Sequence, residues 1–162
     1  MNKLICSDCC LSRSWIALVD DVTALYDLQR FSDAQESIYA QALNELKAGR
    51  KQTHWMWFIF PQMAGLGNSP MAIRYAINSR EEAQAYLDHP RLGSRLRECA
   101  AALLDVQGRT ANQIMGFPDD LKLKSSMTLF ATLPNADPVF RQVLERYFRG
   151  EQDEKTLQLL SG

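Results

Sequence analysis

Apolar residues recur at helical spacing along most of the chain. The clearest series begins at Pro90, after which an apolar side chain returns every three or four residues. A second series follows Asp137-Pro138 and ends at Gly150. Each series forms one apolar face of a helix whose other face meets water. The inward positions of the two predicted helices are Leu92, Leu96, Cys99, Leu103 and Val106, and then Phe140, Val143, Leu144 and Tyr147.

Capping and stop signals mark further helix ends. Gly49 follows an apolar series that begins at Tyr39, and a glycine in that place is typical of a helix C-terminus. Ser79 with Glu82, and Thr110 with Gln113, have the spacing of capping boxes. Ser69-Pro70 is expected to open a helix that reaches about Ile77, and a last helix is expected over residues 154–160.

Residues 54–60 have the composition of a strand, with two tryptophans, two phenylalanines and an isoleucine. A lone strand cannot form a sheet, and no other segment alternates. Thr53 is placed to cap a two-turn helix that Pro61 would end. We therefore predict a central buried helix here, and an all-α fold: an irregular bundle of about seven to eight helices rather than an up-and-down one.

Length and composition agree with one hydrophobic core. The chain has 162 residues, of which 46% are hydrophobic and 23% charged. The first 23 residues differ in character, since they hold Cys6, Cys9 and Cys10. We treat residues 1–23 as an N-terminal extension and residues 24–162 as a single all-helical domain. An alternative start codon can encode a valine such as Val22, so the extension is hypothesised to be absent from the native protein.

Charge and cysteine usage restrict the class of partner. Eighteen basic against nineteen acidic residues give a net charge of −1, which argues against nucleic acid as a partner. No apolar run approaches the roughly 18 residues of a membrane helix. Four cysteines form no disulfide framework and no secretory signal precedes them, so we expect a reduced, cytoplasmic protein. The Cys6-x-x-Cys9 pair lacks a second half, and no metal or organic cofactor is expected.

Two segments carry candidate chemistry. His54 adjoins Trp55 and Trp57, where it would serve as a general acid or base or donate to a phosphate. The alternative is a buried histidine that bonds to a backbone carbonyl. Gln62 leads into Gly65-Leu66-Gly67, a flexible loop whose amides could face a ligand.

The second segment runs from Lys122 to Thr128. On a helix Lys122 shares a face with Ser126, and Lys124 with Thr128. A desolvated lysine can activate a serine. The alternative is that Asp119 and Asp120 favour the helix N-terminus and that the lysines are solvated.

Several strings resemble one known family. They are residues 49–62, 65–67, 75–77, 89–96 and 118–130. They are similar to the uncharacterised bacterial family designated domain of unknown function 1810, and the resemblance runs from about Leu25 to Leu160. It implies a compact all-α domain and no established activity. Some members carry the label calpastatin, but a calpastatin is a disordered, repetitive polar chain, which this composition excludes.

We therefore expect a site between these two segments for a small anionic or nucleotide-like ligand, either bound or processed. The candidate catalytic residues are His54 and Lys124, and the candidate ligand-binding residues are Trp55, Trp57, Gln62, Lys122, Ser125 and Ser126. One alternative is a non-catalytic protein-interaction or adaptor module with an exposed patch of Trp55, Phe58 and Phe60. Another is that the polar residues form a structural hydrogen-bond network.

Overall fold

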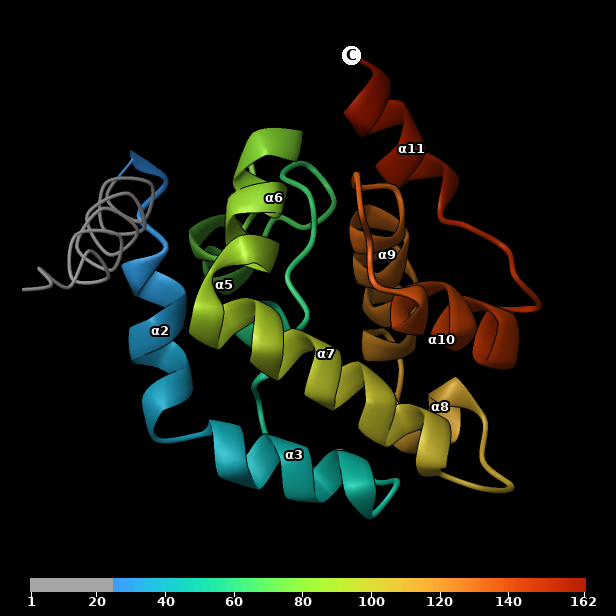
Figure 1. Cartoon of the computed structure of the whole chain (residues 1–162). Coiled ribbons are helices and arrows are strands. Elements are labelled where there is room, and N and C mark those ends of the chain that lie inside the picture. The colour runs from blue at the N-terminus through green and yellow to red at the C-terminus, as the bar shows by residue number, and fades with distance from the viewer. Residues whose placement is uncertain (1–24) are drawn as a thin grey trace, which may run out of the picture.

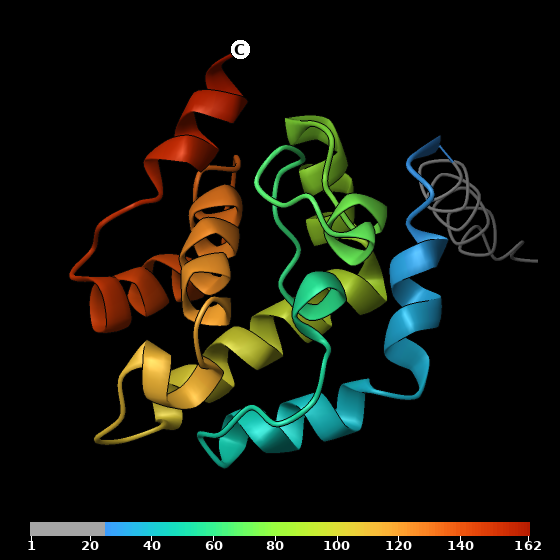
Figure 2. The same cartoon turned by 180° about the vertical axis from the view of Figure 1, so that it is seen from behind.

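Helices make up most of the chain in the computed structural model, which describes residues 25–162 (Figures 1 and 2). The ten helices of this part are α2 (Gln29–Glu36), α3 (Tyr39–Lys47), α4 (Met56–Ile59), α5 (Pro70–Arg74), α6 (Arg80–Asp88), α7 (Pro90–Asp105), α8 (Ala111–Met115), α9 (Asp119–Ala131), α10 (Pro138–Phe148) and α11 (Glu154–Ser161). The predicted all-α fold is confirmed. The count is slightly higher than predicted, because short helices divide the chain more finely than apolar periodicity does. Residues 1–23, predicted as an extension, lie outside the described residues.

The longest helix, α7, crosses the middle of the molecule, with α3 alongside it in both views (Figures 1 and 2). Helices α6 and α10 also pack on α7, and α9 packs against α6, α8, α10 and α11. The predicted inward stripe of α7 is buried, from Leu92 through Leu103. It joins one hydrophobic cluster with residues of the helices around it.

Local signals set several helix ends as predicted. Thr110 and Gln113 form a complete capping box at α8. At α6 only half of the predicted box forms: Ser79 accepts from the Glu82 amide, while the Glu82 carboxylate bonds to Arg30 and Asn78. His89 caps α7, since its Nδ1 accepts from the amides of the next two non-proline residues at 3.2 Å.

The helix predicted at residues 54–60 is present and largely buried, but its predicted length of two turns is wrong. Helix α4 covers only Met56–Ile59. Thr53 does not cap it, because its hydroxyl donates instead to Glu45 Oε1 at 2.7 Å. The helix buried on nearly all sides is α9, in which every residue from Ser125 to Ala131 is buried.

The segment after α5 is also not helical to Ile77. Helix α5 ends at Arg74, and Ile77 pairs with the opposite loop in an isolated bridge to Met63. The Ile77 amide donates to the Gln62 carbonyl, and the Ala64 amide donates to the Ile77 carbonyl, both at 2.8 Å. This pairing holds the Gln62 loop in place at the end of α4.

Candidate functional site

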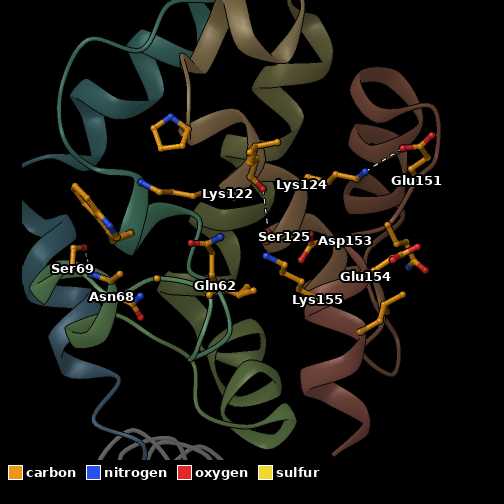
Figure 3. Close-up of a pocket in the computed structure, with 18 residues that line it drawn as sticks. Gln62, Asn68, Ser69, Lys122, Lys124, Ser125, Glu151, Asp153, Glu154 and Lys155 are labelled. Carbon is orange, nitrogen blue, oxygen red and sulfur yellow. Dashed lines mark hydrogen bonds and ion pairs between the residues drawn. The ribbon is translucent and has the colours of Figure 1, made fainter.

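A cleft of about 930 Å³ opens between three parts of the chain (Figure 3). One wall comes from α4, the loop after it and α5, the second from the N-terminal half of α9, and the third from residues 151–157. The wall residues used below are Trp57, Gln62, Lys122, Lys124, Ser125 and Lys155.

The Gln62 side chain lies near the middle of the cleft, with Lys122 and Ser125 above it and Lys155 beside it in Figure 3. Its backbone carbonyl is fixed by the bond from the Ile77 amide. Its side-chain amide forms no hydrogen bond with any residue of the described chain 25–162. The amide therefore presents one acceptor and two donor hydrogens to the cleft.

The buried carboxylate of Glu45 on α3 organises the chain that leads into α4. It accepts hydrogen bonds from the amides of Gln52 and Thr53, from the Thr53 hydroxyl and from Trp55 Nε1. Burial acts to raise the pKa of Glu45, but these hydrogen bonds outweigh it and lower the pKa to about 2. The charged Glu45 thus fixes residues 52–55, and through them the placement of Trp57 at the cleft wall.

Lys122 reaches the cleft from a charge cluster at the start of α9. Its Nζ lies 2.7 Å from Asp119 Oδ1, and Lys51 Nζ lies 2.8 Å from Asp119 Oδ2. Each ammonium also stands over an indole ring, Lys122 over Trp57 at 4.9 Å and Lys51 over Trp55 at 5.1 Å. Burial raises the pKa of Asp119, but the hydrogen bonds from the two lysines outweigh it, so the net shift is downward.

Lys124 extends away from Gln62 toward Glu151 at the rim of the cleft, where the two form an ion pair at 3.2 Å (Figure 3). The same turn of α9 holds the third wall through Thr128. The Thr128 hydroxyl donates to the Lys124 carbonyl at 2.8 Å and accepts from the Asp153 amide at 2.9 Å. Asp153 in turn caps α11 by accepting from the amide and hydroxyl of Thr156.

The structure brings five of the eight predicted site residues to this cleft: Trp57, Gln62, Lys122, Lys124 and Ser125. It leaves three elsewhere. His54 is exposed and does not line the cleft, so the alternative of a buried histidine is wrong. Trp55 is fully buried against Glu45, and Ser126 is fully buried, with no partner for its hydroxyl in the described part of the chain.

The structure also bears on the two alternatives to a ligand site, the exposed aromatic patch and the structural hydrogen-bond network. Trp55, Phe58 and Phe60 are buried in the core, so the exposed patch predicted from them is wrong. The hydrogen-bond network at the start of α4 centres on Glu45, whereas His54, Gln62 and Ser126 contribute no side-chain bond to it.

Sequence reasoning missed Glu45, Lys51 and the wall at residues 151–157. Lys51 lies in one of the strings that resemble the family, which was its only signal. Glu45 and the third wall carry no local signal, because tertiary packing brings them to the site. Within residues 25–162, no cluster of histidine, cysteine, aspartate and glutamate is arranged to hold a metal ion. None of the helices in this range has the length and apolar character to cross a membrane.

Comparison with known proteins agrees with the resemblance found in the sequence. The chain is similar to a conserved hypothetical protein of Mycobacterium tuberculosis, solved as a crystal structure, with 53% identity and a TM-score of 0.83. The match covers 85% of this chain and 98% of the mycobacterial one. No curated protein matches the chain. The sequence profile of the family described as Protein of unknown function (DUF1810) matches residues 25–160. The chain therefore belongs to the DUF1810 family.

Proposed function

We propose that the cleft between α4, α9 and α11 binds a small molecule that carries an anionic group such as a carboxylate or a phosphate. The observation that carries the proposal is the Gln62 side-chain amide, which lies in the cleft without a hydrogen-bond partner among residues 25–162, while the Gln62 backbone is held by the bond from the Ile77 amide. A polar group that is fixed in place but left unpaired is suited to bond a ligand directionally.

The surroundings of Gln62 favour an anion. Lys122 is one of two lysines that share the single carboxylate of Asp119, so this wall of the cleft carries an excess positive charge. Trp57 adds an aromatic surface beside it. A cation, a directional amide and an aromatic ring together suit a ligand with a charged group and an apolar or flat body.

Binding is better supported than catalysis. His54, the predicted general acid or base, is outside the cleft. The Ser125 hydroxyl donates to the Leu121 carbonyl at 3.2 Å rather than to a base, and Lys124 is paired with Glu151. A serine nucleophile needs an adjacent base to become reactive. We therefore propose a binding domain, and the cytoplasm as its location on the cysteine pattern given above.

A thermal-shift screen of phosphorylated and carboxylated metabolites, including nucleotides, tests the proposal. A ligand at about 100 times its dissociation constant should stabilise the protein by about 2.7 kcal/mol, which raises the melting temperature by several degrees. Gln62→Ala and Lys122→Met should abolish this shift. Lys47→Met, which removes an exposed lysine on α3 outside the cleft, is the matched control and should keep it.

A compound that stabilises all four proteins equally would show binding outside the cleft. The absence of any stabilising compound, with normal melting of the variants, would reject the proposal.

A second candidate function is a protein-interaction module, and one observation favours it. Phe117, which precedes the cleft residue Pro118, is 77% exposed, and Leu121, which lines the cleft, is 53% exposed. Exposed apolar side chains next to one another on a surface are typical of contact sites for other proteins. Phe117→Ser, at a residue that does not line the cleft, would then abolish concentration-dependent self-association or partner binding and leave thermal shifts by small molecules intact.

A further inference from the structure

The charges around the cleft are not evenly matched. At the rim, Lys124 is paired with Glu151. On α11, Lys155 stands next to Glu154, and both are exposed. The charges of these two pairs cancel, and the Asp153 carboxylate, which also lines the cleft, is engaged in capping α11. The cluster at the start of α9 is different, because two lysines, Lys51 and Lys122, contact the two oxygens of one carboxylate, that of Asp119.

The two lysines occupy different places in the structure. Lys122 lines the cleft, and its side chain is 24% exposed. Lys51 does not line the cleft, and its side chain is 8% exposed. Lys51 is held there by Asp119, by the Thr53 carbonyl at 2.8 Å and by the Trp55 ring. A ligand in the cleft can therefore touch Lys122 while Lys51 stays behind the wall.

The net charge of the cluster depends on the hidden lysine. With Lys51 present, two positive charges face one negative charge, and the cluster carries +1 (2 − 1). Without Lys51, the cluster would contain only Lys122 and the Asp119 carboxylate, and its net charge would be zero. Lys51 is partly buried, and screening by solvent is weaker for such a charge than for one on the surface.

We infer that Lys51 is a positioning residue for the anion site: by sharing the Asp119 carboxylate with Lys122, it gives the cluster the net positive charge with which Lys122 receives an anionic group, a carboxylate or a phosphate ester. This inference rests on the proposed function, since it concerns the charge of the same cleft. The inference adds a residue, Lys51, that does not contact the ligand but makes the site selective for a negatively charged one.

The test is a set of single and double variants of the full chain that change the net charge of the cluster. Inorganic phosphate is the probe, and it is titrated at constant ionic strength. Binding is followed by NMR through the side-chain amide signals of Gln62. Lys51→Met brings the cluster charge to zero and should weaken binding about tenfold, as expected for a charge lost a few ångströms from the anion. Adding Asp119→Asn to Lys51→Met restores the charge to +1 and should restore binding to within about threefold of the wild type. Lys47→Met removes the same charge from an exposed site on α3 and should leave binding unchanged.

Each result has one meaning. Weaker binding in Lys51→Met with recovery in the double variant supports the inference, because the second substitution restores the charge of the cluster but not the contacts of Lys51 with Thr53 and Trp55. Equal binding by wild type and Lys51→Met overturns it, and so does a double variant that stays weak. Loss of binding in Lys47→Met would trace the effect to overall charge and overturn it too. If phosphate shifts no Gln62 signal in the wild type, the proposed anion site itself fails.

Discussion

The indole nitrogen of Trp55 donates a hydrogen bond of 2.8 Å to Glu45 Oε2, across ten positions of sequence. This bond ties the segment before α4 to the end of α3, and it is one of five that converge on the same carboxylate. The charged side chain is 7% exposed, so the site's first wall depends on a buried anion that is satisfied by its own neighbours.

Glu45→Gln should lower the free energy of unfolding by about 2–3 kcal/mol. The glutamine keeps the shape of the side chain but presents a donor group to backbone amides and an indole that are themselves donors. Chemical denaturation of both proteins at neutral pH measures the difference. Glu36→Gln, at an exposed position of α2, is the matched control and should change stability by less than about 0.5 kcal/mol. A Glu45→Gln protein as stable as the wild type would contradict this role.

The contribution of Glu45 should vanish in acid. Its pKa is about 2 in the folded protein against an ordinary value of 4.5, so the unfolded chain takes up a proton first as the pH falls. The stabilisation is therefore complete above pH 4.5 and is lost as the pH falls toward 2. Denaturation of wild type and Glu45→Gln over this range should give converging stabilities. A constant gap between them would mean that the ionised form is not what stabilises the fold.

His89 should make the stability of α7 depend on pH near neutrality, at higher pH than the range in which Glu45 titrates. Burial lowers the pKa of His89, with a smaller contribution from the positive charge of Arg91. Its neutral Nδ1 accepts the capping bonds, so the contribution is present above the ordinary pKa of 6.5 and decreases as the pH falls below it. His89→Ala should cost about 1 kcal/mol at neutral pH.

His89→Asn offers the control for that effect. Asparagine is a good capping residue and does not titrate, so this variant should keep the cap and lose the pH dependence. The comparison needs thermal melting of the three proteins on both sides of neutrality. If His89→Asn shows the same pH dependence as the wild type, the titrating group is not His89.

Thr128→Val should loosen α11 while leaving the rest of the fold intact. Valine has the same shape, but it cannot accept the bond from the Asp153 amide that holds the start of α11 against α9. Hydrogen exchange should become faster in residues 153–161, with a loss of about 1 kcal/mol in global stability. Thr132→Val is the matched control, since the Thr132 hydroxyl bonds only to the Leu129 carbonyl in its own helix. Unchanged exchange in α11 would show that Thr128 does not anchor it.

Much of the fold could be predicted because its signals are local. The start of α7 at Pro90, the start of α10 at Pro138 and the capping box of α8 depend on residues within one turn of each other. The extent of α4 could not be predicted, since the Thr53 hydroxyl that would cap it bonds to Glu45, eight residues away on another helix. A capping residue with a stronger partner elsewhere no longer marks a helix start.

The candidate site was accessible to sequence reasoning only in part. Gln62, Lys122 and Ser125 lie in the two segments that the sequence singled out, and they line the cleft. Ser126 shares a helix face with Lys122, yet it does not reach the cleft, since on that face the long side chain of Lys122 extends beyond the buried surface and the short side chain of Ser126 does not. The contribution of residues 151–157 follows from how α11 packs on α9, and no spacing in the sequence encodes it.

The most direct test of the anion-binding cleft is to map where a stabilising compound from the metabolite screen binds. Isotope-labelled protein is titrated with that compound, and the shifted NMR signals are assigned to residues. The account predicts that the largest shifts fall on the Gln62 side-chain amide, the Trp57 indole and the first turns of α9. Shifts that cluster away from the cleft, with the Gln62 and Trp57 signals unmoved, would contradict it.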